Sequence, residues 1–254
     1  IDPQPTSACA YNFQQAENLA GEVRAELGLG TTPISSLGNL AENLGVIWFV
    51  EDFGGAADGA CIELPGSDDD FRTGVAVVDG TQDPGRRRWS LAHEVGHFVM
   101  GDPYASDRPA GDIEQMVDAF VVYLLMPREG CRRPWNDYSS EGARRVALAI
   151  SARFGTSWSA ACSQLRNLGL VSYGELDRLK DAPPTRGDYL VPEESWTPDL
   201  EPPAVPTRYT SSVLAAFQRG DLALERTLKL LRGTIERSEL PERHPVRSGS
   251  YMAL

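Results

Sequence analysis

The stretch SLAHEVGHFVM, residues 90–100, carries the most informative motif of the chain. It contains His-Glu-x-x-His, and a spacing of four residues places His93 and His97 on one face of a helix, one turn apart. Glu94 lies about 100° round the helix from His93, close enough to act on a water molecule without being a ligand. The other residues are mostly apolar, which predicts a buried helix. Because a buried helix carries two imidazoles and a carboxylate only when something pairs with them, we expect a metal site rather than a chance pattern.

The limits of this helix are also predicted from local signals. Ser90 is expected to be its N-cap, and Gly101, followed by Pro103, is expected to end it. The basic run Arg86–Arg88 comes just before and is expected to lie in a solvated loop. Its alternatives are stabilising an oxyanion and binding an acidic region.

A second helix is expected from Asp112, as its N-cap, to the residue before Pro127. Glu114 and Asp118 are four residues apart and share a face, and Asp118 falls within a nearly unbroken apolar run. Zinc catalysis needs three protein ligands and one open position. The order His-Glu-x-x-His, then Glu-x-x-x-Asp, resembles the thermolysin-like zinc peptidases. That resemblance implies that Glu114 is the third ligand of one zinc ion per chain and that Asp118 hydrogen-bonds a ligand histidine. The alternative is an ordinary capped helix with surface acids.

Both segments together resemble a more narrowly defined family. RWSLAHEVGH at residues 88–97, with the segment from Glu114 to LLMP at residues 124–127, is similar to the ImmA/IrrE metallopeptidases over roughly residues 15–180. The resemblance implies a bacterial, cytoplasmic zinc metallo-endopeptidase that cleaves a transcriptional repressor of the XRE type. Cleavage would derepress genes of mobile elements or stress responses. Many members carry Asn where this chain has Asp118, but either side chain can accept a hydrogen bond from an imidazole.

The catalytic role in this interpretation falls to Glu94. It would take a proton from the attacking water and pass it to the leaving amine. A protein of another class is the alternative: a catalytically idle sensor that binds a repressor or DNA, with a structural metal. A structural metal site has no need of a base, so Glu94 favours the enzyme.

Three further residues are candidates for roles at the site. Tyr104, between the two helices, and Tyr123 could each donate a hydrogen bond to a developing oxyanion. Cys61 is a candidate inhibitory thiol, because a thiolate could occupy the open coordination position. A small buried hydrophobic residue is the commoner use of a lone Cys.

The remaining pattern predicts an α+β fold, with a small mixed sheet packed on a zincin-type helical core. Helices are expected at residues 12–28 and 35–43, and strands at 46–50, 59–64 and 73–78. The last of these is expected to be the edge strand that pairs with substrate. A helix-turn-helix-like unit at 141–168 and a C-terminal hairpin of helices at 210–219 and 221–232, the second capped by Asp221, should follow. The predicted divisions are a peptidase domain (1–130), the helix-turn-helix-like unit (131–181), a Pro-rich linker (182–207), and the hairpin with its tail (208–254).

Charge is distributed unevenly along the chain. The formal net charge is −12, and residues 1–85 carry 14 acidic but only 2 basic side chains. An acidic half is a poor surface for phosphate, so we do not expect direct DNA binding. It suits a basic partner such as a DNA-binding repressor, although a solvated acidic face is the simpler explanation for any single carboxylate.

Composition places the protein among globular cytoplasmic chains. The chain has 254 residues, 41% of them hydrophobic, and no run approaches the roughly 20 apolar residues that span a bilayer, so no membrane partner is expected. Four scattered cysteines, with no secretory signal at the start, favour reduced thiols. The first residue is Ile1 rather than Met, so we expect a processed or shortened form of a longer chain. The apolar stripe of the C-terminal helices predicts burial against the peptidase or, in a homodimer, against a second copy.

Overall fold

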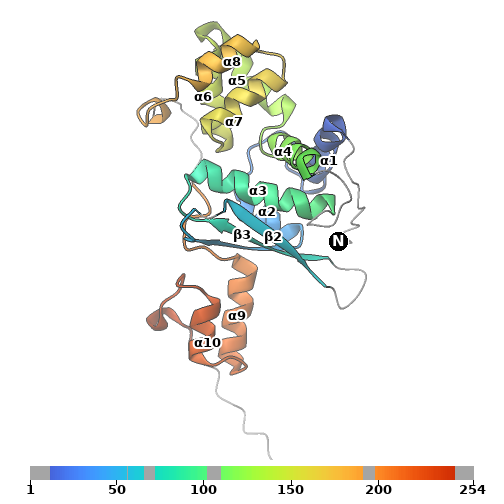
Figure 1. The fold of residues 1–254 in the computed structure, drawn as a ribbon. Helices are drawn as coiled ribbons and strands as arrows, with labels where there is room; N and C mark the ends of the chain where they lie inside the picture. The colour runs from blue at the N-terminus through green and yellow to red at the C-terminus, as the bar shows by residue number, and fades with distance from the viewer. Residues whose placement is uncertain (1–11, 56, 66–71, 102–109, 191–197, 244–254) are drawn as a thin grey trace, which may run out of the picture.

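The computed structural model describes residues 12–55, 57–65, 72–101, 110–190 and 198–243. It has an α+β fold with one small mixed sheet, which confirms the predicted class (Figure 1). The strands are β1 (Val46–Glu51), β2 (Gly59–Leu64) and β3 (Thr73–Asp79). The helices are α1 (Phe13–Glu26), α2 (Leu37–Asn43), α3 (Pro84–Met100), α4 (Ala110–Leu125), α5 (Arg128–Tyr138), α6 (Ala143–Phe154), α7 (Trp158–Asn167), α8 (Tyr173–Lys180), α9 (Thr207–Arg219) and α10 (Leu224–Leu230).

The sheet has the strand order β1-β3-β2, with β1 parallel and β2 antiparallel to β3. β3 is therefore the central strand, and the prediction that residues 73–78 form the substrate-pairing edge was wrong. Local sequence cannot reveal this order, because β3 pairs with both earlier strands and separates them. Of the two edges, that of β1 is partly covered, since Val50 and Ala204 exchange backbone hydrogen bonds of 2.9 and 3.1 Å.

The two faces of the sheet have different neighbours. The inner face meets α2 and α3: Trp48 donates to the Gly38 carbonyl of α2 at 2.9 Å, and Gly74 lies directly under Phe98 of α3. A Cβ at Gly74 would come within 2.8 Å of the Phe98 ring, so the glycine permits this close approach. Figure 1 shows α3 lying across this face.

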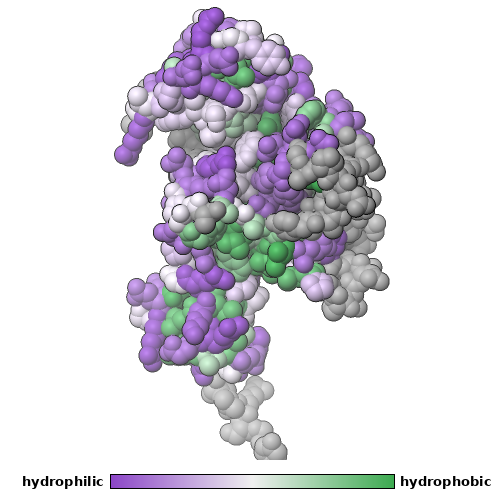
Figure 2. Space-filling model, in the orientation of Figure 1, coloured by the Kyte–Doolittle hydropathy of each residue, from purple (hydrophilic) through white to green (hydrophobic). Residues whose placement is uncertain are grey.

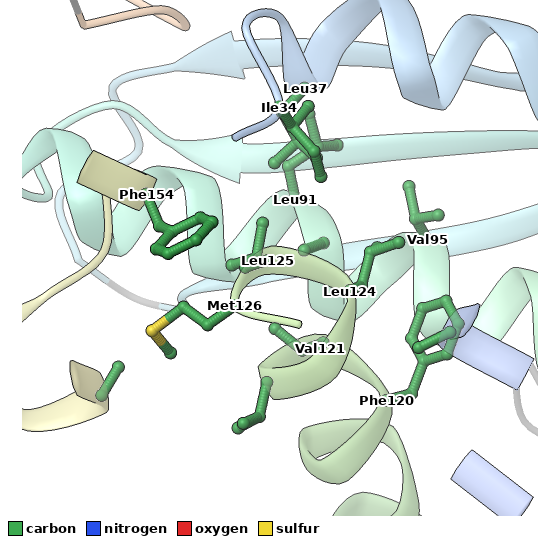
Figure 3. Close-up of a cluster of buried hydrophobic side chains, with 14 of the residues drawn as sticks. Ile34, Leu37, Leu91, Val95, Phe120, Val121, Leu124, Leu125, Met126 and Phe154 are labelled. Carbon is green, nitrogen blue, oxygen red and sulfur yellow. The ribbon is translucent and has the colours of Figure 1, made fainter. Parts of the chain in front are cut away.

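The main core lies where α3 meets α4. Leu91 and Val95 of α3 are fully buried against a cluster that includes Val121 and Leu124 of α4 (Figure 3). Helix α1 packs on α4, and Arg24 of α1 donates to the Leu124 carbonyl at 2.5 Å. This packing fixes the relative position of the two helices that carry the predicted metal ligands.

Helix α3 begins earlier than local signals predicted. Pro84 occupies its first turn after Asp83, so Ser90 is inside the helix and donates to Gln82 at 3.0 Å instead of capping it. Gly101 ends the helix in the left-handed conformation (φ 73°), as predicted. Asp112 is likewise not an N-cap, because α4 already begins at Ala110.

The basic run before the metal motif is helical rather than a solvated loop. Arg87 and Arg88 are buried in α3. The Arg88 guanidinium donates to both carboxylate oxygens of Asp199 at 2.7 Å, and Arg87 donates to Glu201 at 2.7 Å. Residues 198–206, which belong to the predicted linker, thus lie along α3 and β1; we call this segment the strap. The domain divisions themselves stay predictions.

The C-terminal half of the chain is helical. Helices α6 and α7 form the predicted helix-turn-helix-like pair. Helices α5 and α8 were not predicted, and α5 contains Pro134, a residue that is unfavourable inside a helix. The C-terminal hairpin of α9 and α10 contacts β1 through Tyr209, whose ring lies 5.3 Å from that of Phe49. Asp221 pairs with Arg219 at 2.8 Å instead of capping α10.

No helix among the described residues has the length and apolar character needed to cross a bilayer.

Candidate metal centre

The site is built where α3 and α4 approach most closely. Gly96 makes this approach possible: a Cβ there would lie 2.9 Å from Val117 and 3.1 Å from Phe120, both on α4. Because the glycine lies between the two motif histidines, it brings their helix against the face of α4 that carries Glu114.

The three predicted ligand side chains converge. The Nε2 atoms of His93 and His97 are 3.1 Å apart. The Glu114 carboxylate lies 3.0 Å from His93 Nε2 and 3.5 Å from His97 Nε2. These residues form a group of metal-binding type, with ligand atoms within 4.8 Å of one another. The structure therefore brings together the three residues that the sequence singled out.

The spacing of these atoms suits a divalent ion. Atoms that bind a tetrahedral zinc ion at about 2.0–2.1 Å lie roughly 3.3–3.4 Å from one another. The observed separations of 3.0, 3.1 and 3.5 Å bracket this value. Two imidazoles and one carboxylate are also a donor set that zinc accepts in catalytic sites. The residues present thus fit a metal ion held by His93, His97 and Glu114.

Asp118 lies one helical turn beyond Glu114 and contacts the other nitrogen of the first histidine. Its Oδ1 is 3.2 Å from His93 Nδ1. A proton on Nδ1 that is donated to this carboxylate leaves the lone pair of Nε2 facing the other ligands. Burial by itself lowers the pKa of His93, but the hydrogen bond and charge of Asp118, with Glu94 and Glu114, outweigh it, so the pKa is raised.

Glu94 is buried beside the ligands, with a relative exposure of 7%. Burial raises the pKa of its carboxyl to about 7, the nearby His93 opposes the shift, and the charge of Glu114 adds to it. A Cβ at Gly59 of β2 would lie 3.1 Å from Glu94 Oε1, so this glycine leaves the carboxylate its space. A carboxyl whose pKa lies near neutrality can both accept and return a proton.

The other predicted site residues are not among the three convergent side chains, or they lie outside the described part. Tyr123 is on the side of α4 that faces α1, where its hydroxyl accepts from Arg128 at 3.3 Å and Glu17 also contacts it. Cys61 is buried on the inner face of β2, and burial raises the pKa of its thiol to about 12. Its sulfur is not one of the converging ligand atoms, and its role as an inhibitory thiol stays a prediction. Tyr104 lies outside the described residues.

Two features of the site had no clear sequence signal. Gly59 touches Glu94 from β2, and only the sheet order places it there. The Arg88–Asp199 pair joins α3 to a segment more than a hundred residues later in the chain, a contact that local pattern cannot reveal.

Comparison with known proteins agrees with the geometry. Residues 56–166 match the family model Peptidase_M78, described as the IrrE N-terminal-like domain. The search of curated proteins gave no match. The matched region begins just before β2 and contains both α3 and α4, hence all three convergent side chains. Residues 56–166 are therefore similar to the IrrE N-terminal-like domain, which confirms the resemblance to the ImmA/IrrE family.

Proposed function

We propose that this protein is a zinc-dependent endopeptidase that cleaves a peptide bond in a bacterial repressor of the XRE type, in the cytoplasm. One observation carries the enzymatic part: two imidazole nitrogens and a carboxylate converge within 3.5 Å while the carboxylate of Glu94 lies buried beside them. A site that only held a metal for structure would not need this additional acid.

His93, His97 and Glu114 would hold the zinc ion. When bound, zinc supplies Lewis acidity, which lowers the pKa of water and polarises a carbonyl. Glu94 takes a proton from the attacking water and returns it to the leaving amine, and its burial keeps its pKa in the range for both steps. Asp118 holds the His93 ring with Nε2 directed at the site.

The substrate would bind as an extended strand on the free edge of β2. Within the described residues this edge has no partner strand, whereas the edge of β1 is partly covered by Ala204. β2 begins at Gly59, which touches Glu94, so a peptide paired with β2 would pass the catalytic carboxylate.

A repressor as substrate rests on the family and on charge. The acidic balance of residues 1–85 suits a basic partner. Direct DNA binding by α7 has little support, because Gln164 is buried and donates to the Met126 carbonyl at 2.7 Å, while Arg166 lies over the Tyr173 ring. A homodimer through α9 and α10 stays a prediction.

The test is Glu94→Gln, with the repressors encoded beside the gene as candidate substrates. The variant should bind one zinc per chain, by elemental analysis, and should lose cleavage by at least about a hundredfold, the usual range for a general base. Glu129→Gln on the surface of α5 is the matched control and should cleave like the wild type. Equal cleavage by Glu94→Gln would refute the role of this carboxylate.

A sensor with a structural metal is the rival function. It predicts that wild-type protein binds a repressor but cleaves none, with or without chelator. Cleavage that stops on chelation and returns with zinc would exclude it.

A further inference from the structure

The outer face of the sheet, which points away from α3, is apolar and exposed on its β2 side, whereas on its β1 side Phe49 is buried against Tyr209 of α9. Its residues on β2 are Ala60, Ile62 and Leu64, and the register places Val75 of β3 and then Ile47 of β1 in one row with Ile62. Ile62 and Leu64 are 54% and 38% exposed. They are two of the four large hydrophobic side chains of the described residues that stand exposed. Figure 2 shows apolar side chains gathered over the sheet.

The inner side of β2 differs from its outer side, where Ile62 and Leu64 are exposed. Cys61 is buried towards α3, and Glu63 is paired with Arg72 at 2.7 Å. An edge strand in water is normally protected by charged side chains on its open face, whereas β2 has two aliphatic ones. A free edge with an aliphatic outer row is a surface that can receive another strand.

The position of β2 relates this row to the catalytic carboxylate. Gly59 at its start touches Glu94, and Glu63 near its end pairs in register with Gly74, which lies under Phe98. β2 therefore runs along α3 from the catalytic residue to one residue past His97. At about 3.3 Å per residue, positions opposite Ile62 and Leu64 lie roughly 10 and 17 Å from the position opposite Gly59.

We propose that Ile62 and Leu64 are specificity determinants that select aliphatic side chains three and five residues from the scissile bond. The ligand is an extended protein segment with an aliphatic residue at alternate positions. Paired with β2, it directs those side chains to the outer face, where directly opposite residues are in contact. The proposal rests on the proposed function, because it takes the scissile bond to lie at Glu94.

The experiment has a cleavage arm and a binding arm. In the first, wild-type protein, Ile62→Thr and Ile47→Thr digest a proteome-derived peptide mixture, and mass spectrometry maps the residues around each cleaved bond. Threonine keeps the branched side chain that suits a strand, so the sheet should be retained. Ile47→Thr is the matched control, since it changes the same row two strands away from the free edge.

At the third and fifth positions on one side of the cleaved bond, wild-type protein should prefer Ile, Val or Leu over Asn. The expected preference is about two- to fivefold in kcat/KM. Ile62→Thr should abolish the preference at the third position through KM, with kcat unchanged, because the contact is remote from the chemistry. Ile47→Thr should keep it. An identical preference in wild type and Ile62→Thr would overturn the proposal, while cleavage itself would leave the proposed function intact.

The binding arm separates the two ideas further. Fluorescein-labelled dodecapeptides of alternating Val-Lys or Asn-Lys sequence are titrated against the Glu94→Gln variant and against Glu94→Gln/Ile62→Thr, with fluorescence anisotropy as the readout. Tighter binding of the Val-Lys peptide, lost in the double variant, supports the proposal even if no peptide is cleaved. Equal binding of both peptides overturns it.

Discussion

The polar side chains at the two ends of helix α3 have different kinds of partner. At the N-terminal end, the guanidinium of Arg88 is fully buried and its charge is matched by Asp199 of the strap. In the second half, His93 and His97 face each other, and the acids beside them, Glu114 and Asp118, are 52% and 55% exposed in their side chains. At the N-terminal end, the counter-charge comes from the chain itself. In the second half, the side chains of His93, His97 and Glu114 direct potential metal-ligand atoms at one position, which lies near exposed acids.

This difference separates anchoring from function on one helix. A buried ion pair positions α3 against α2 as well, because Asp199 also accepts from the Leu37 amide at 2.8 Å and Arg88 donates to the Ile34 carbonyl at 2.9 Å. The candidate metal site requires only that α3 and α4 approach each other closely. Stability should therefore depend mainly on the first end and metal affinity on the second.

Replacement of Arg88 by methionine should have the largest effect. The change leaves Asp199 without its cation in a largely buried position, and breaking such a pair by removing one partner costs about 3–5 kcal/mol. Urea unfolding followed by circular dichroism measures the loss. The matched control is Arg86→Ala, two residues earlier, whose pair with Asp58 is exposed and should contribute about 0–1 kcal/mol. Similar losses for both variants would remove the special role of the strap.

Gly96→Ala tests the approach of the two helices and should have an intermediate effect. The new methyl group would lie 2.9 Å from Val117 and 3.1 Å from Phe120, so α3 and α4 must separate. Overpacking of this kind costs about 1–3 kcal/mol, partly offset by up to about 1 kcal/mol of helix propensity. Zinc affinity, measured by competition with a chromophoric chelator, should fall as well, because Glu114 moves with α4.

The control for this change is Gly21→Ala in the exposed part of α1. Nothing lies within 4 Å of a Cβ there, so the substitution should stabilise the protein by about 0.5–1 kcal/mol and leave zinc affinity unchanged. If Gly96→Ala behaved like Gly21→Ala, the proposed need for close packing at the site would be wrong.

The sequence predicted one end of α3 well and the other poorly. Spacing within one helix is a local property, so the facing positions of the two imidazoles could be predicted from the sequence. The predicted end of the helix at Gly101 was also correct. The run Arg86–Arg88 looks like a solvated loop because the partners of Arg87 and Arg88, which are Glu201 and Asp199, lie more than a hundred residues away. A charged residue is predicted to be exposed unless its partner is known.

The same reasoning explains the error in the sheet. All three strands were located to within one residue at each end, since alternation and β-branched content are local. Their order was not, because β1 and β2 follow each other in sequence yet are separated by β3. The free edge at β2, and with it Gly59 beside Glu94, depends on this non-local pairing.

Asp118→Asn should have the smallest effect and gives the most specific test of the second end. The amide oxygen can still accept the proton of His93 Nδ1, so zinc affinity should change less than about tenfold, while Asp118→Ala should lower it about 10- to 100-fold. Chelator competition gives both values, with Asp112→Asn in the exposed first turn of α4 as the control. Equal losses for Asn and Ala would mean that the charge of Asp118 matters, not its hydrogen bond. No loss for Ala would mean that His93 is oriented by the packing of α3 alone, and the two ends of the helix would then differ less than their contacts indicate.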